Sequence, residues 1–181
     1  WDPERPLGCL FLLPLWNPVL VAEQVGTLAS IHPGPFLLQT GIGDGDGQFA
    51  AMNADLRTRG KVLDESIRVI KALLAGETVD SEHFGISGAQ VNPRPPQGVR
   101  WWIGAGGPGP LRRAAREGDA WYGGPHVSAE SSEMIDLYRD EAARLDRPSE
   151  VIVRKDVIIL RDGDRATELG DELVRRGYRG M

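Results

Sequence analysis

Residues 100–110 read Arg-Trp-Trp-Ile-Gly-Ala-Gly-Gly-Pro-Gly-Pro. An apolar run that opens into glycines and prolines predicts a buried strand, a tight turn and the start of a helix. Successive N–H groups in such a turn, together with the positive end of the helix, suit a phosphate group. A tight turn that binds nothing explains the pattern equally well. The stretch is neither a P-loop, because it lacks Gly-Lys-Ser/Thr, nor a complete Rossmann fingerprint.

The same alternation of apolar strand and amphipathic helix continues on both sides of this stretch. Expected strands cover residues 7–13, 36–43, 100–105, 119–123 and 150–160, and expected helices cover residues 18–31, 48–75, 108–118, 129–145 and 165–176. This order predicts an α/β fold with a parallel sheet and right-handed crossovers. The sheet is either open and doubly wound or part of a (β/α) barrel. Both architectures bind ligands at the carboxyl ends of their strands, where the glycine clusters 41–47, 104–109 and 123–124 fall.

Two segments depart from regular alternation. The long helical stretch 48–75 is expected to break near Asn53 or Gly60. Residues 77–99 contain three prolines, which are excluded from central strands, so we expect an irregular excursion there, with a small hairpin as one alternative.

Composition bounds the class of protein. With 181 residues, 41% hydrophobic and 26% charged, residues 1–181 fit one globular domain or a piece of a larger one. A net charge of −5 without a basic face argues against a nucleic-acid partner, and no apolar run is long enough to cross a membrane. The single cysteine, Cys9, excludes an intrachain disulfide and indicates a reducing, cytoplasmic compartment. Because the chain starts at Trp1 and enters a strand almost at once, we expect a fragment of a longer enzyme; a trimmed complete domain is the alternative.

Few side chains outside the glycine turns indicate chemistry. The histidines are far apart and have no metal-ligand spacing, so no metal site is expected: His32, His83 and His126. Cys9 lies inside an apolar run, which favours packing over a reactive thiol. Three tryptophans in expected strands suit core packing, with the lining of a ring-binding cavity as the alternative: Trp101, Trp102 and Trp121.

Six segments occur in a characteristic order. They are Leu13-Pro-Leu-Trp-Asn-Pro18, the Gly41-Ile-Gly43 strand end, Arg59-Gly60 with Leu63-Asp-Glu65, Asn92-Pro-Arg-Pro95, Trp102-Ile-Gly104 with Gly106-Gly-Pro108, and Gly118-Asp-Ala-Trp121. Together they resemble the bacterial luciferase-like monooxygenase family, which includes flavin- and deazaflavin-dependent oxidoreductases. No one motif is specific, but their order is, and the resemblance covers residues 7 to about 160.

The resemblance implies a partial (β/α)8 TIM barrel. The five strands expected here would be about five consecutive βα units, with two strands of the family barrel before them and one after. The chain would then be a single incomplete barrel domain, interrupted by the excursion at residues 77–99.

The resemblance also implies a cofactor that is a flat tricyclic ring with a phosphate tail, either FMN or coenzyme F420. Its phosphate would lie at Gly106, Gly107 and Pro108, and family members often carry a bulge with a non-prolyl cis peptide against the ring, which maps near Cys9 and Leu10. The full set of expected cofactor-binding residues is Cys9, Leu10, Gly41, Gly43, Ala105, Gly106, Gly107 and Pro108.

The implied function is that of an oxidoreductase or monooxygenase acting on a small organic substrate. The alternative is a non-catalytic cofactor-binding or structural remnant of the same barrel. A composition rich in Arg, Gly, Asp and Pro resembles that of high-GC bacteria, which favours F420 over FMN. Residues that act on substrate in the family lie in earlier strands, so no catalytic acid or base is named and activity from residues 1–181 alone is not expected. The resemblance leaves a homo-oligomer open for the full-length protein.

Overall fold

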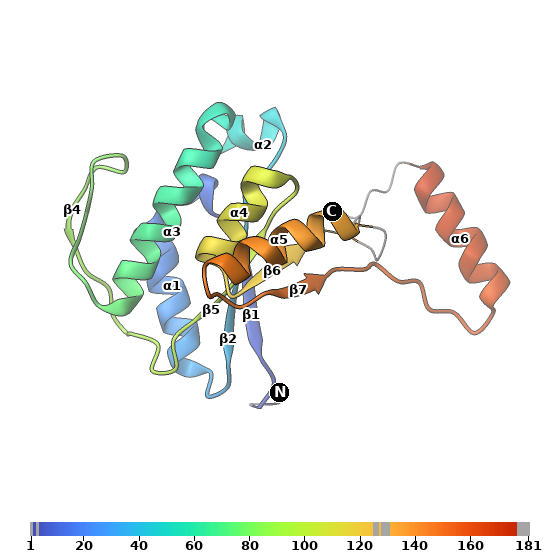
Figure 1. Cartoon of the computed structure of the whole chain (residues 1–181), viewed down its shortest axis with the longest axis horizontal. Helices are drawn as coiled ribbons and strands as arrows, with labels where there is room; N and C mark the ends of the chain where they lie inside the picture. The colour runs from blue at the N-terminus through green and yellow to red at the C-terminus, as the bar shows by residue number, and fades with distance from the viewer. Residues whose placement is uncertain (1, 3, 125–126, 128–130, 177–181) are drawn as a thin grey trace.

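The computed structural model describes residues 2, 4–124, 127 and 131–176. Five strands form one parallel sheet, β1 (Leu7–Leu12), β2 (Phe36–Gly41), β5 (Arg100–Gly104), β6 (Ala120–Gly123) and β7 (Glu150–Val153), and their order in the sheet is their order in the sequence (Figure 1). A doubly wound sheet reverses its strand order at an interior switch point, and this one does not. The sheet is therefore an arc of a barrel, as the barrel alternative predicted.

Four helices pack on one face of the sheet: α1 (Pro18–Ile31), α3 (Arg59–Ala75), α4 (Pro108–Glu117) and α5 (Ser132–Arg144). At the start of α1, the Asn17 side chain accepts a hydrogen bond from the Val19 amide, and Pro18 occupies the first helical position, where no N–H is needed. Apolar side chains from both layers form one core, including Val25, Leu38, Leu63, Ile70, Ile103, Leu111, Trp121 and Tyr138. Burial of these side chains is what fixes the helices to the sheet.

Both expected irregularities are present. The stretch after β2 divides into α2 (Asp46–Ala51), the 3-10 turn η2 (Leu56–Thr58) and α3, with Asn53 at a φ of +51° in the break. Gly60 lies inside α3 and does not interrupt it. The excursion contains an antiparallel hairpin of β3 (Val79–Ser81) and β4 (Ile86–Ala89), and a second 3-10 turn, η1 (Leu13–Leu15), follows β1.

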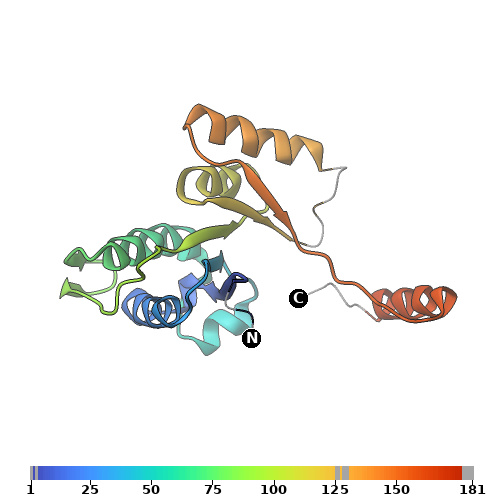
Figure 2. The same cartoon turned by 90° about the horizontal axis from the view of Figure 1, so that it is seen from below.

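The last strand and helix differ from the prediction. The expected strand 150–160 is paired only from Glu150 to Val153, because its partner β6 ends at Gly123 and no strand of the described residues lies beside the residues that follow. Val157 and Ile159 are consequently exposed. Helix α6 (Gly163–Arg175) stands apart from the other helices, at the far end of this extended segment (Figure 1; Figure 2). Helix α6 has no buried residue, and its Leu173 lies beside Val157 and Ile158.

The face of the sheet opposite the helices, here called the open face, carries every second strand residue. Strand pleating assigns to it Gly8, Leu10, Leu12, Leu37, Gln39, Gly41, Arg100, Trp102, Gly104, Ala120, Tyr122, Glu150 and Ile152. Leu10 is 56% exposed on this face. Near its amino end, Arg100 and Glu150 form an ion pair of 2.7 Å from β5 to β7, across the intervening β6.

The hairpin is fastened to α3 by one carboxylate. Glu65 accepts a hydrogen bond of 2.6 Å from the Ser81 hydroxyl and pairs with Arg68 at 2.7 Å, while Arg68 also donates to the Asp80 carbonyl. The hydrogen bond from Arg68 is the largest influence on Glu65, and it lowers the pKa of that carboxyl from 4.5 to about 2. The charged form of Glu65 is thus favoured in the folded state.

We expect Glu65→Gln to change how stability depends on pH. A carboxyl whose pKa is lowered by folding contributes stability above its unfolded pKa of 4.5 and loses that contribution as the pH falls toward about 2. The variant should therefore be less stable than wild type at pH 7, and the difference should shrink between pH 4.5 and 2. Urea unfolding at a series of pH values measures this. Glu23→Gln, at an exposed site on α1, is the control, and an equal pH dependence in both variants would contradict the assignment.

Candidate functional site

A cavity of about 460 Å³ opens at the carboxyl ends of β2, β5 and β6. Its lining comes from the segments after these strands and from the starts of α3 and α4: Ile42, Gly43, Asp44, Arg59, Gly104, Ala105, Gly106, Pro110, Arg113, Tyr122 and Gly124. Three of the expected cofactor-binding residues, Gly43, Ala105 and Gly106, lie together here although they come from distant parts of the sequence. This is the end of the sheet at which (β/α) barrels bind their ligands.

The turn from β5 into α4 requires glycine at two points. A Cβ on Gly104 would stand 3.0 Å from the Thr40 carbonyl oxygen of the neighbouring strand. Gly107 is the N-cap of α4 and has a φ of +136°, which side chains rarely adopt. A Cβ on Gly106 or Gly107 would meet no atom within 4 Å, so the outer side of the turn is open to a ligand.

The turn offers backbone donors, but fewer than an ordinary helix start. Pro108 and Pro110 have no N–H, so the first turn of α4 keeps the amide of Gly109 alone among its first three residues. Within the described part of the chain, no hydrogen bond uses the amides of Gly106, Gly107 or Gly109. Three N–H groups are thus free to meet an anion at this point.

Two arginines supply positive charge to the same cavity. Arg59, the first residue of α3, pairs with Asp44 at 3.2 Å, and the Asp44 side chain is 93% exposed. Arg113 of α4 is 14% exposed and donates to both oxygens of Asp64, at 2.5 and 3.1 Å. Sequence reasoning missed both as site residues. Arg59 belongs to the Arg59-Gly60 motif, but nothing in the pattern indicates that it lies beside a turn near residue 106.

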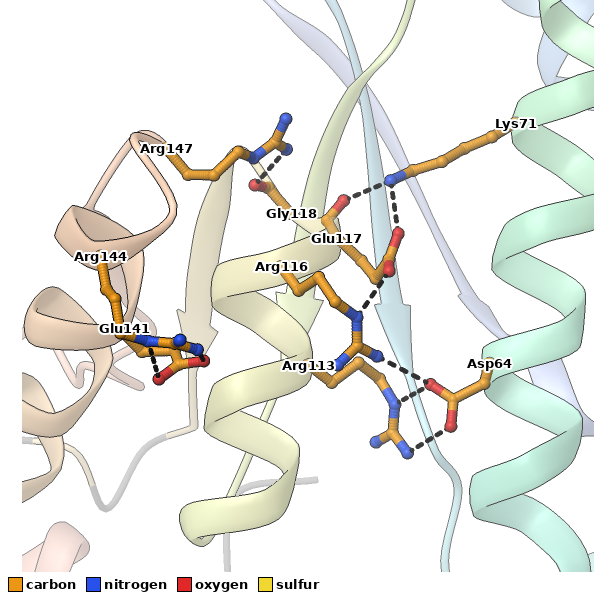
Figure 3. Close-up of polar contacts among 9 residues, drawn as sticks. All are labelled: Asp64, Lys71, Arg113, Arg116, Glu117, Gly118, Glu141, Arg144 and Arg147. Carbon is orange, nitrogen blue, oxygen red and sulfur yellow. Dashed lines mark hydrogen bonds and ion pairs between the residues drawn. The ribbon is translucent and has the colours of Figure 1, made fainter.

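A network of ion pairs fixes α4 against α3 (Figure 3). Besides the Asp64–Arg113 pair, Arg116 lies 2.9 Å from Glu117, and Lys71 donates to the Glu117 carbonyl oxygen at 2.6 Å and to its carboxylate at 3.1 Å. Burial raises the pKa of Glu117, but hydrogen bonds from Arg116 and Lys71 outweigh it and leave that pKa below its ordinary value. The network therefore holds the C-terminal half of α4, from Arg113 to Glu117, against α3.

The remaining expected site residues lie at different distances from the cavity. Gly107 and Pro108 continue the turn, and Gly41 lies beside Gly104 on the open face, its Cα 3.7 Å from the position of a Gly104 Cβ. Cys9 faces the helices, half-buried, where burial raises the pKa of its thiol to about 11, and Leu10 lies on the open face. Neither lines the cavity.

The expected bulge near Cys9 and Leu10 is not present. Strand β1 pairs with β2 residue by residue from Leu7 to Leu12, which leaves no extra residue, and the one cis peptide of the described residues is Asn92–Pro93.

The tryptophans divide between the core and the open face. Trp101 and Trp121 are core residues, and the Trp121 indole N–H donates to the Ala105 carbonyl at 3.1 Å, whereas Trp102 lies on the open face. The described residues hold no group of three or more His, Cys, Asp and Glu side chains placed to bind a metal ion; His126 lies outside them. None of their helices has the length and apolarity needed to cross a membrane.

We expect Asp64→Asn to destabilise the protein by about 1–3 kcal/mol, because it removes a charged acceptor from a mostly buried arginine. Urea unfolding measures the loss. Asp136→Asn, at an exposed site on α5, is the matched control and should change stability by less than about 0.5 kcal/mol. Equal effects of the two substitutions would show that the pair with Arg113 contributes nothing.

Comparisons with known proteins agree with this architecture. The profile of the luciferase-like monooxygenase family matches residues 8–179. The F420-dependent glucose-6-phosphate dehydrogenase of Mycolicibacterium smegmatis is 29% identical over 158 residues, which are 82% of this chain and 47% of that protein. The chain spans about half the length of the curated relatives it matches.

Solved structures share the fold at low sequence identity. A riboflavin lyase determined with modified FMN and riboflavin superimposes with a TM-score of 0.75 at 13% identity, over 96% of this chain and 46% of that one. The coenzyme F420 dependent tetrahydromethanopterin reductase of Methanopyrus kandleri gives 0.73 at 21% identity, over 92% and 54%. Because the family profile covers nearly the whole chain and the sheet follows the same architecture, this chain belongs to the luciferase-like monooxygenase family, and its five parallel strands are part of a (β/α)8 barrel.

Proposed function

We propose that the protein carrying this chain is an oxidoreductase that uses coenzyme F420 or FMN to oxidise or reduce a small organic substrate. The observation that carries the proposal is the cavity at the strand ends, where a turn with free amides and two arginines lie together. The F420-dependent relative at 29% identity favours F420 of the two cofactors. A non-catalytic cofactor-binding barrel would share the same cavity, and turnover of substrate by the full-length protein separates the two.

The residues fit the phosphate of such a cofactor. An anion beside Gly106 and Gly107 would meet free N–H groups and no side chain. A Cβ added to either glycine would have no atom within 4 Å. Pro108 and Pro110 lack N–H groups, so the start of α4 has two hydrogen-bond donors fewer than usual. The backbone amides by themselves therefore form only a weak anion-binding site. We propose that Arg59 completes it, because its present partner Asp44 is almost fully solvated and readily exchanged for a phosphate.

The roles of the cofactor and of the protein follow from the chemistry of such cofactors. The bound ring would supply the hydride or electron transfer, and the protein supplies binding, orientation and exclusion of water. In this chain, Gly104 and Gly41 would let a flat ring approach the strand backbones, and Asp64, through Arg113, would keep the turn in place. No acid or base of this chain is assigned to the reaction.

Substitution of Gly107 by Asp should weaken cofactor binding at least tenfold, or about 1.4 kcal/mol, because a carboxylate would repel the phosphate. Gly106→Asp tests the charge without a positive φ, since Gly106 does not adopt one. Gly85→Asp in the distant hairpin, at a φ of +62°, is the control for backbone strain alone. Titration of the full-length protein with FMN and with F420, followed by ring fluorescence, gives the affinities. Unchanged affinity in both turn variants would remove the phosphate from this turn.

Arg59→Ala should weaken FMN binding about tenfold and leave riboflavin binding unchanged, because riboflavin has the same ring without the phosphate. Arg57→Ala, two residues away and 89% exposed, is the matched control and should affect neither ligand. Asp44→Asn should tighten FMN binding, since it frees Arg59 from its competing partner. Equal losses for FMN and riboflavin in Arg59→Ala would mean that Arg59 acts on the fold rather than on the phosphate.

A further inference from the structure

Trp102 and Tyr122 form an aromatic pair on the open face of the sheet. They come from adjacent strands, β5 and β6, and their rings stack with centroids 6.3 Å apart at an interplanar angle of 18°. Both side chains are only half-buried, unlike the core tryptophans on the helix side. The pair therefore lies on the side of the sheet that faces the interior of the barrel.

Tyr122 stands next to a gap in the side chains of this face. The register pairs Leu12 with Gly41 and Gly104 with Tyr122, and Gly41 and Gly104 are themselves neighbours. The row of residues nearest the carboxyl ends thus runs Leu12, Gly41, Gly104, Tyr122. Two adjacent glycines leave a shallow hollow between a leucine and a tyrosine, whose strands lie three spacings apart, or about 14 Å. Tyr122 and Gly104 also line the cavity described above.

The indole N–H of Trp102 has no acceptor in the described part of the chain although the atom is buried. A buried donor without a partner is uncommon in folded proteins and marks a group that is satisfied by something else. A residue chosen only to fill space would carry no such penalty, because Phe fills similar volume without a donor. Because this face is the interior of the (β/α)8 barrel, the acceptor of the Trp102 N–H belongs to the barrel interior, and the glycine hollow that Tyr122 borders is the observation that indicates a ligand.

We infer that Tyr122, held in place by its stack on Trp102, is a specificity-determining residue that forms the side wall for the flat ring of the bound cofactor. The inference rests on the proposed function and adds to it the residue that recognises the ring, as distinct from the phosphate. Tyr122 contributes a rigid aromatic surface at the edge of the glycine hollow, and ring contacts of this kind favour planar ligands over flexible ones. Trp102 is a positioning residue that acts through Tyr122.

The test separates ring binding from phosphate binding with two ligands. In the full-length protein, Tyr122→Leu should weaken whichever of FMN, riboflavin and F420 the wild type binds by the same factor, about tenfold, because all three carry a flat tricyclic ring. Tyr122→Phe should keep these affinities within about twofold, since it retains the aromatic surface. Phe84→Ala, which removes an aromatic ring from the distant hairpin region, is the matched control and should change none of them. Ring fluorescence gives the affinities, and thermal unfolding shows whether each variant is folded.

Trp102 provides a second, independent readout. Trp102→Phe should weaken both ligands, and its effect should not add to that of Tyr122→Leu, because the two residues act as one unit. The assignment of Tyr122 as the ring wall would be wrong in two cases. In the first, Tyr122→Leu weakens the binding of FMN but not that of riboflavin. In the second, it leaves both affinities unchanged although the wild type binds both ligands. If wild type bound neither FMN, riboflavin nor F420, the proposed function itself would fail, which is a different result. Full additivity of the two substitutions would overturn the positioning role of Trp102.

Discussion

The parallel pairing of β2 with β5 is the contact on which the candidate site depends. It joins strands separated by α2, α3 and the hairpin, and it aligns Leu38 with Trp101 and Thr40 with Ile103. The pairing brings the loop after Gly41 beside the turn after Gly104, so that residues from both line one cavity. Glycine at position 104 is a condition of this approach, because a side chain there would meet the Thr40 carbonyl. Without this pairing, the loop after Gly41 and the turn after Gly104 would be two separate turns and would not share a cavity.

The two faces of the sheet have opposite roles. The helix side is filled with apolar side chains and carries most of the buried core, which makes the position of each strand costly to change. The open face is only partly covered, and it combines an ion pair near its amino end with small residues and aromatic rings toward its carboxyl end. In a (β/α)8 barrel the open face is the interior, and ligands bind at its carboxyl end, where the cavity lies.

The charged residues divide between holding the fold and meeting a ligand. Arg113 is mostly buried and bound at two nitrogens by Asp64, so its charge is already committed to the contact between α3 and α4. Arg59 has one contact to a solvated carboxylate and is free to change partner at little cost. The anion site that we propose therefore combines a glycine turn, on a helix that is tied to α3 by partly exposed ion pairs, with one adaptable cation.

The sequence by itself determined the order of strands and helices, the break near Asn53 and the glycine turn that begins α4, because these depend on local periodicity, capping and backbone freedom. Its motifs also indicated the family. Only the tertiary structure decided that the last strand stops at Val153, since a strand ends where its neighbour does, and that α6 buries nothing. It alone brought Arg59 to the glycine turn and stacked Trp102 on Tyr122. These contacts join residues far apart in the chain, and strand register and helix placement, which no local pattern encodes, set which of them meet.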